Sequence, residues 1–324
     1  MDIYVKKAII HQFSPDDTDL YLADKLLNIT PKIEEYLRKK IERVYSDEAR
    51  TGIFEEDNPF LEMISDDLLE TSVAVANRWK EEFVVSENQK TNDLVFIQFS
   101  KEGVDHFAFL RIALRETLTH LGDEVENPIK LTQNNLPGFG TGADEALVIN
   151  LQSRKYHLIE KRIKYNGTFL NYFSENLLQA QPKISPKKSI KALEKTAQKI
   201  AESFNTDDFQ FQSKVKSAIF NHIEEENKLS PEKLADDLFD DNLTARLSFI
   251  DQVKEAVPEP VTFEEIDASR QLKKFENQKL SLSNGIELIV PNNVYEDAES
   301  VEFILNENGT YSILIKNIED IQSK

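Results

Sequence analysis

Two apolar runs on either side of a short polar turn constrain the fold of this chain most. The first run, Leu94 to Phe99, reads Leu-Val-Phe-Ile-Gln-Phe, and the second extends from Val104 to Leu114. Lys101-Glu102-Gly103 lies between them, and apolar runs joined by a short turn that contains glycine are typical of a β-hairpin. The sequence therefore predicts that the first half is built around a mainly antiparallel sheet.

Apolar spacing and helix-start signals indicate the other elements of this half. Ile3 to Phe13 is rich in Ile and Val and ends before Ser14-Pro15, which predicts a strand. Thr30 followed by Pro31 predicts the start of a helix whose apolar residues recur at steps of three and four. The remaining predictions are helices at about 18–27 and 60–85, the latter broken once, and strands at 129–133, 146–151 and 156–163.

The second half changes character at Asn166-Gly167. From about residue 168 to 255 the pattern predicts helices, with starts at Ser185-Pro186, at 206–208 and at Ser230-Pro231. Asn284-Gly285 and Asn308-Gly309 each lie between two apolar runs, and an Asn-Gly pair supplies the positive φ angles of a tight hairpin turn. We therefore expect an α+β protein with an α+β sheet domain at 1–165 and a helical domain ending in β-hairpins at 166–324.

Composition limits the classes of function. The chain has 324 residues, 40% of them hydrophobic, and a formal net charge of −19, so it can bury a core and repels DNA at long range. It has no cysteine, which excludes disulfides and thiolate chemistry and suits a reducing cytoplasm. The first ten residues, MDIYVKKAII, lack the pattern of a signal peptide, and no run of eighteen apolar residues occurs. We expect a cytoplasmic protein without a membrane partner.

A lysine-rich stretch departs from this acidic background. Residues 182–199 read PKISPKKSIKALEKTAQK, with six lysines and one glutamate. On a helix that starts after Ser185, Ile190, Leu193, Ala197 and Ile200 form a buried face. Lys187, Lys191, Lys195 and Lys199 then form one stripe, to which Lys183 and Lys188 are adjacent. Like charges four residues apart, and lysines in the first turn of a helix, work against helix stability.

Three interpretations of this stretch remain open. In the first, the lysines form a solvated helix face that pairs with acidic helices such as Asp236-Asp237 or Glu224–Glu226. In the second, they bind phosphate backbones. In the third, they bind a protein partner. Lys161, Arg162 and Lys164 would extend the basic surface if the fold brings them close. The stretch lacks the interleaved aromatic residues of single-strand binding.

No pattern identifies a catalytic site, a metal site or a cofactor. The Gly138–Gly142 loop has neither the full dinucleotide fingerprint nor a Lys-Ser/Thr pair, so a mobile surface loop is the favoured interpretation and its role stays open. The five histidines are scattered, and adjacent aspartates point in different directions on a helix. A metal-dependent nuclease is a remote alternative that would use the acidic clusters.

Several segments, in their order and spacing, resemble the bacterial 37-kDa nucleoid-associated protein family (NdpA family). They are Arg43-Val44-Tyr45-Ser46 with Gly52-Ile53-Phe54, then Phe169 to Phe173, then Val261 to Glu265, and finally the Asn-Gly hairpin region. The resemblance covers nearly the whole chain, and the mass of 37.3 kDa agrees.

The resemblance implies a non-enzymatic protein of the cytoplasm and nucleoid, with no catalytic residues to carry over. Its partners would be double-stranded DNA, bound weakly and without sequence preference through the lysine stretch, or DNA-bound proteins. In the second case the chain is an acidic adaptor that docks on DNA-processing proteins without binding DNA itself. A homodimer would suit a protein that bridges DNA, although no residue demands one.

Overall fold

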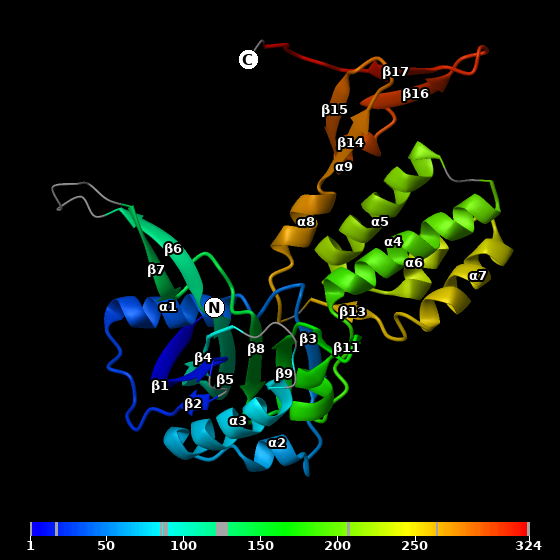
Figure 1. Cartoon of the computed structure of the whole chain (residues 1–324). Coiled ribbons are helices and arrows are strands. Elements are labelled where there is room, and N and C mark those ends of the chain that lie inside the picture. The colour runs from blue at the N-terminus through cyan, green and yellow to red at the C-terminus, as the bar shows by residue number, and fades with distance from the viewer. Residues whose placement is uncertain are drawn as a thin grey trace. The chain divides into compact units, whose positions relative to one another are not determined.

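A computed structural model describes residues 2–322 apart from 17–18, 85, 87–89, 121–128, 206–207 and 264. The chain divides into two compact units, Met1–Ser185 and Pro186–Lys324. Figure 1 shows their elements, which together contain helices and an antiparallel sheet, so the predicted α+β class is confirmed.

Within the described residues of the first unit, seven strands form one sheet in the order β2-β1-β4-β5-β8-β9-β3, and every pair is antiparallel. The predicted hairpin is its centre: Phe96 lies opposite Phe109, and the turn residues Glu102 and Gly103 have φ angles of 53° and 82°. The strands are β1 (Ile3–Ser14), β2 (Asp19–Tyr21), β3 (Arg50–Ile53), β4 (Asn92–Lys101), β5 (Val104–Ala113), β8 (Glu145–Asn150) and β9 (Lys155–Ile159).

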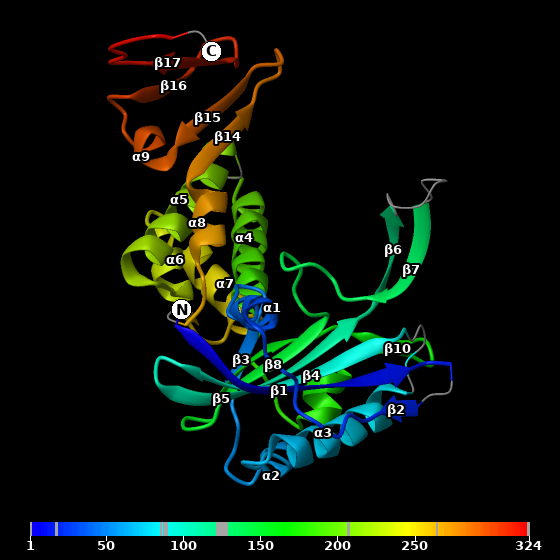
Figure 2. The ribbon, with the colours of Figure 1, turned by 90° about the vertical axis from the view of Figure 1, so that its left-hand side faces the viewer.

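Helices cover both faces of this sheet, which is why β4 and β5 are apolar on both sides. Leu37 and Ile41 of α1 (Pro31–Glu42) pack with one face, and Trp79 of α3 (Leu68–Phe83) packs with the other. Figure 2 shows α1 and α3 on opposite sides of the strands. The short helix α2 (Pro59–Glu62) and the single π-helical turn η1 (Phe173–Leu177) contribute to the α3 side.

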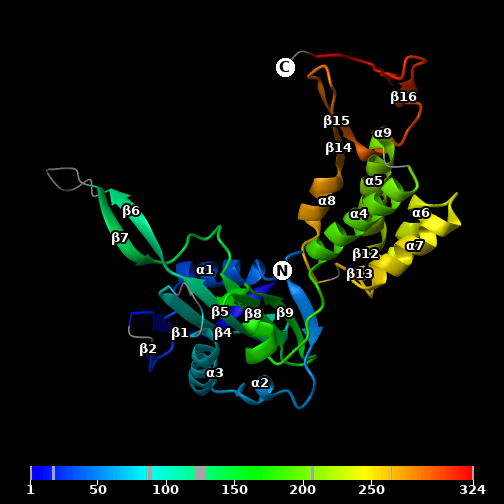
Figure 3. The ribbon, with the colours of Figure 1, turned by 45° about the vertical axis from the view of Figure 1, so that its right-hand side comes forward.

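Two ribbons complete the first unit. β6 (Arg115–His120) and β7 (Ile129–Asn135) pair only with each other within the described residues, and Figure 3 shows them extending away from the sheet. Leu118 lies opposite Leu131, and both are more than half exposed. The second ribbon joins β10 (Ile163–Tyr165) to β11 (Thr168–Leu170) through Asn166 and Gly167, both with positive φ.

The prediction of a helix at about 18–27 is wrong for the described residues 19–27. Asp19–Tyr21 instead forms β2, which pairs with Gln12–Ser14 of β1. The Ala23 N–H donates to Nδ1 of His11 (3.0 Å), and the Leu27 N–H donates to the carbonyl of Ala8 (2.8 Å). Because β1 supplies these acceptors, the segment satisfies its backbone by lying along the sheet edge rather than by coiling.

The predicted helices of the second unit are confirmed from residue 186 onward. Asp208 and Ser230 cap α5 and α6 through bonds to backbone N–H groups three residues later. The elements are α4 (Pro186–Ser203), α5 (Phe209–Glu226), β12 (Lys228–Leu229), α6 (Pro231–Leu238), α7 (Leu243–Lys254), β13 (Val261–Thr262), α8 (Ser269–Phe275) and α9 (Asn292–Tyr295), with hairpins β14 (Asn277–Ser281) to β15 (Glu287–Pro291) and β16 (Val301–Leu305) to β17 (Tyr311–Ile315).

Both hairpins form as predicted, but their turns differ from the expected geometry. Gly285 and Gly309 have φ angles of 87° and 79°, whereas the asparagines before them do not have positive φ. In the first turn the Gly285 N–H donates to Leu282 O (2.9 Å) and the Leu282 N–H to Ile286 O (2.8 Å). This is a three-residue loop closed by a left-handed glycine, in which only the glycine needs positive φ.

The boundary between the two units lies after Ser185, later than the division at about residue 165 that the change of composition indicates. Residues 168–170 form a strand instead of continuing the predicted helical region. Tyr172, Phe173 and Leu177 are buried against α3 and the sheet, and the Lys183 N–H donates to the carbonyl of Thr51 (2.8 Å). Apolar burial therefore holds this segment in the first unit.

Candidate nucleic-acid interface

Helix α4 carries five of the six lysines of the basic stretch, and its apolar face fixes their direction. Ile190, Leu193, Ala197 and Ile200 are at most 2% exposed in the core of the second unit. This core includes Phe249 and Val253 of α7. The lysines at 187, 188, 191, 195 and 199 are all exposed, as is Lys183. The predicted division of the helix into a buried and a basic face is therefore confirmed.

The lysines of α4 have few carboxylate partners. Lys199 Nζ donates to the side-chain oxygen of Gln252 on α7 (2.9 Å). Among the described residues, no carboxylate pairs with the ammonium group of Lys188, Lys191 or Lys195. Glu194, the acidic residue within the stretch, pairs with Lys274 of α8 (3.3 Å).

Three of the acidic residues proposed as partners of this face pair elsewhere. Asp236 binds Arg246 (3.0 Å), Asp237 binds His222 (2.7 Å), and Glu226 binds Lys233. The Glu226 and Lys233 atoms lie 2.5 Å apart. These contacts leave Lys188, Lys191 and Lys195 without a carboxylate partner among the described residues.

Helix α8 adds three cations that the sequence reasoning did not select. Arg270, Lys273 and Lys274 are exposed, and the ion pair of Lys274 with Glu194 places the end of α8 beside α4. The signal in the sequence was the short run Arg-Gln-Leu-Lys-Lys, but only the tertiary structure joins it to the lysine stripe.

The three cations expected to extend the basic surface belong to the first unit and are partly engaged there. Lys161 Nζ pairs with Asp144 Oδ1 (2.6 Å). Arg162 donates to the carbonyl of Phe169 (3.2 Å) and lies over its ring at 5.5 Å. Lys164 lies on β10. These three residues lie in the first unit, whereas α4 lies in the second.

The Gly138–Gly142 loop is held on α1 by a buried lysine. Lys40 Nζ donates to the carbonyl oxygens of Gly138 (2.9 Å), Thr141 (2.6 Å) and Pro137 (3.3 Å), and the side chain is 0% exposed. Burial, followed by the charges of Arg43 and Arg115, lowers the pKa of Lys40 to about 8. These hydrogen bonds hold the loop on α1.

A buried network of polar side chains, joined by hydrogen bonds, lies beneath α3. Arg111 Nε donates to Glu145 Oε2 (2.5 Å), and its Nη1 donates to Asn92 Oδ1 (2.8 Å). Tyr172 donates to the same carboxylate and accepts from Trp79 Nε1 (3.0 Å). Desolvation and the charge of Glu145 raise the pKa of Tyr172 well above its ordinary value. Because every charge is buried and paired, the network is a structural feature of the core.

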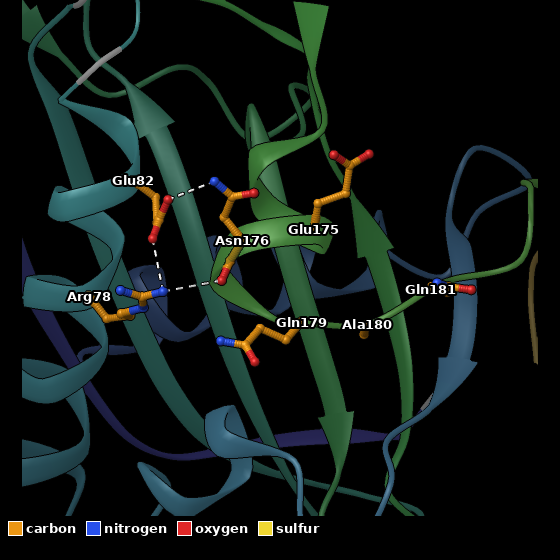
Figure 4. A pocket seen from close by; sticks show the side chains of 7 residues that line it. All are labelled: Arg78, Glu82, Glu175, Asn176, Gln179, Ala180 and Gln181. Carbon is orange, nitrogen blue, oxygen red and sulfur yellow. Dashed lines mark hydrogen bonds and ion pairs between the residues drawn. The ribbon is translucent and has the colours of Figure 1, made fainter.

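An open groove of about 580 Å³ lies between α3 and the segment from η1 to Gln181 (Figure 4). Arg78 pairs with Glu82 (2.9 Å) and donates to the carbonyl of Asn176 (3.4 Å), while Asn176 Nδ2 donates to Glu82 (2.8 Å). The cation that lines this groove is therefore already engaged, and we assign the groove no ligand.

The described part of the chain contains no group of three or more histidine or acidic side chains that could hold a metal ion. It also contains no helix that is long and apolar enough to cross a membrane. What the structure presents is a basic helix, rigidly seated on its own core, in an α+β protein of strongly acidic composition.

These features define a class of acidic proteins with a local cationic surface. Comparison with known families makes the assignment more specific: residues 9–321 match the family described as "NA37: Nucleoid-associated protein YejK". The match covers nearly the whole chain, so this protein belongs to that family, and the predicted resemblance is confirmed. No curated protein matches the chain in sequence.

Proposed function

We propose that this protein is a non-enzymatic component of the bacterial nucleoid that binds double-stranded DNA weakly through α4. The observation that carries the proposal is the exposed lysine stripe at 187, 191, 195 and 199, with Lys188 on the same helix. No described carboxylate neutralises Lys188, Lys191 or Lys195. The family name supports the nucleoid as the place of action.

The chemistry of this face explains why binding would be weak and independent of sequence. Lysine ammonium groups contact phosphate oxygens and release counterions, and phosphate contacts carry no base information. The net charge of −19 opposes approach of the same polyanion. Contact is therefore restricted to the local basic surface, to which Arg270, Lys273 and Lys274 of α8 contribute.

The proposal is tested by fluorescence anisotropy of a labelled duplex across a salt series. In the test variant, Lys187, Lys191, Lys195 and Lys199 are all changed to Gln. Each phosphate contact contributes about 0.9 to the slope of log K against log salt. Loss of four contacts should therefore lower the slope by up to about 3.6 and weaken binding most at low salt.

A matched control variant makes the same change in net charge at four other lysines of the second unit. Lys214, Lys228, Lys233 and Lys279 are also exposed, and the variant that changes all four to Gln should keep the wild-type slope. If both variants lose slope equally, the effect is one of net charge, and α4 is not a specific phosphate surface.

A second candidate function is an acidic adaptor that docks on DNA-processing proteins. It is favoured by exposed apolar residues near the end of the chain, where Leu305, Ile318 and Ile321 are 62%, 53% and 83% exposed. An adaptor of this kind would show no salt-dependent DNA affinity as a pure protein. Pull-down of purified DNA-processing enzymes, lost when Ile318 and Ile321 are changed to Ser, would then identify the surface.

A further inference from the structure

A second hollow, of about 730 Å³, lies at the base of the β6–β7 ribbon in the first unit. It is formed where three parts of the chain meet: the segment before β4, the junction of β5 with β6, and the end of β7. Its polar lining includes Lys90, Thr91, Arg115, Glu116, Gln133, Asn134 and Asp144. No motif indicated this site, because its residues are spread over more than fifty positions of the sequence.

The two cations of the hollow have no partners among the described residues. Lys90 and Arg115 are exposed, and neither makes an ion pair or side-chain hydrogen bond there. The two acidic residues, in contrast, are engaged. Asp144 binds Lys161 (2.6 Å) and the Ala113 N–H (2.9 Å), and Glu116 accepts from the amide of Gln133 (3.2 Å).

Further positive charge lies beside the hollow. Arg43 packs against the loop that carries Asp144, since its Cδ lies 3.8 Å from where a Cβ on Gly142 would stand. Lys40 holds the same loop through three carbonyl oxygens. Arg43 and Arg115 are both close enough to Lys40 for their charges to disfavour its protonation. Arg43 and Lys40 therefore add positive charge beside the lining residues Lys90 and Arg115.

Hydrogen bonds also hold the segments that form the rim in place. Lys40 fixes the 137–141 loop on α1, and Tyr36 adds a hydrogen bond to the carbonyl of Pro137 (3.1 Å) and an edge-on contact with Phe139. On the opposite side, Asn135 Nδ2 donates to the carbonyl of Thr132 (2.9 Å), which steadies the end of β7. Unpaired cations on a fixed concave surface, with amide groups nearby, are the chemistry of an anion site.

We propose that this hollow binds a phosphate group, with Lys90 and Arg115 as its charged contacts. The phosphate could belong to a DNA backbone or to a free nucleotide, since both present the same oxygen atoms. In the first case the inference rests on the proposed function, which is DNA binding. It deepens that function by adding a DNA contact on the first unit to the contact proposed for α4. In the second case it stands alone.

The test compares Lys90→Gln/Arg115→Gln with the matched control Lys25→Gln/Lys32→Gln, whose lysines are exposed in the same unit. Two probes are used with the full chain: a labelled duplex followed by anisotropy over 50 to 200 mM salt, and ATP or pyrophosphate followed by calorimetry. Loss of two phosphate contacts should lower the salt slope by about 1.8 and low-salt affinity by about tenfold. Far-UV circular dichroism checks that each variant is folded.

The outcomes show whether the phosphate belongs to DNA or to a nucleotide, and they test this site independently of the α4 interface. Weaker duplex binding and a lower salt slope in the Lys90/Arg115 variant than in the Lys25/Lys32 control assign the phosphate to DNA. Weaker binding of ATP and pyrophosphate than in that control assigns it to a nucleotide. If neither probe distinguishes this variant from the control, the inference is overturned. The four-lysine α4 variant is measured in parallel, so failure of the α4 interface appears as an unchanged slope in that variant alone.

Discussion

Gly52 lies opposite Tyr156 in the β3–β9 pair, and the tyrosine ring occupies the space that a side chain on Gly52 would need. A Cβ at Gly52 would stand 2.3 Å from Tyr156 Oη and 2.5 Å from its Cζ. Ordinary van der Waals contact begins at about 3.4 Å, so Gly52→Ala requires a displacement of about 1 Å.

The size of the effect follows from what surrounds the ring. Tyr156 is 1% exposed, and its ring lies 4.4 Å from that of Phe54, so it cannot move aside freely. β3 is at the edge of the sheet and can yield to some extent. We expect a loss of about 1–3 kcal/mol, the usual cost of overpacking. For a unit of this size the loss lowers Tm by about 2–12 °C.

The assay is thermal unfolding followed by tryptophan fluorescence, because the chain has one tryptophan and Trp79 lies in the core of the first unit. Tyr156→Leu removes the ring, so adding Gly52→Ala to that variant should cost less than about 0.5 kcal/mol. A Gly52→Ala protein as stable as wild type, or an equal cost in both backgrounds, would refute the steric explanation.

Three further predictions concern buried polar groups of the first unit. Arg111→Met leaves the Glu145 carboxylate buried without its cationic partner and should cost about 3–5 kcal/mol in urea unfolding, most of which Arg111→Met/Glu145→Gln should recover. Burial lowers the folded-state pKa of His11, so its contribution to stability is present above about pH 6.5 and is lost as pH falls; His11→Gln should flatten the decline in Tm between pH 7.5 and 5.5. Lys40→Met removes three hydrogen bonds to the 137–141 loop, and faster amide exchange confined to that loop should follow, whereas unchanged exchange would mean that Lys40 does not hold it.

Local signals in the sequence predicted most of the second unit. The caps at Asp208 and Ser230 and the glycines at 285 and 309 act within a few residues of their own positions. Such interactions are nearly the same in any tertiary context, so pattern and propensity suffice to find them. The hairpin at the centre of the sheet was equally clear, because both of its strands are mainly apolar and are joined by a short turn that contains glycine.

The errors occurred where residues outside the local pattern supplied the hydrogen-bond partners or the apolar contacts. Residues 19–27 have leucines at helical spacing. Their backbone instead pairs with the edge strand β1 and donates a hydrogen bond to the ring of His11. Residues 168–185 follow a clear change of composition, but Phe173 and Leu177 find their apolar contacts in the first unit. Neither contact can be recognised from spacing alone, since it depends on residues far away in the chain.

The sequence by itself determined that α4 has one apolar and one basic face, because the 3.6-residue period and the lysine spacing fix both. Only the tertiary structure decided that the acidic helices pair with Arg246, His222 and Lys233 and leave most of these lysines without carboxylate partners. It also decided that Lys90 and Arg115 share one hollow. The physical reason is that helix faces are set by local periodicity, whereas charge neutralisation depends on which side chains the fold brings within a few ångströms.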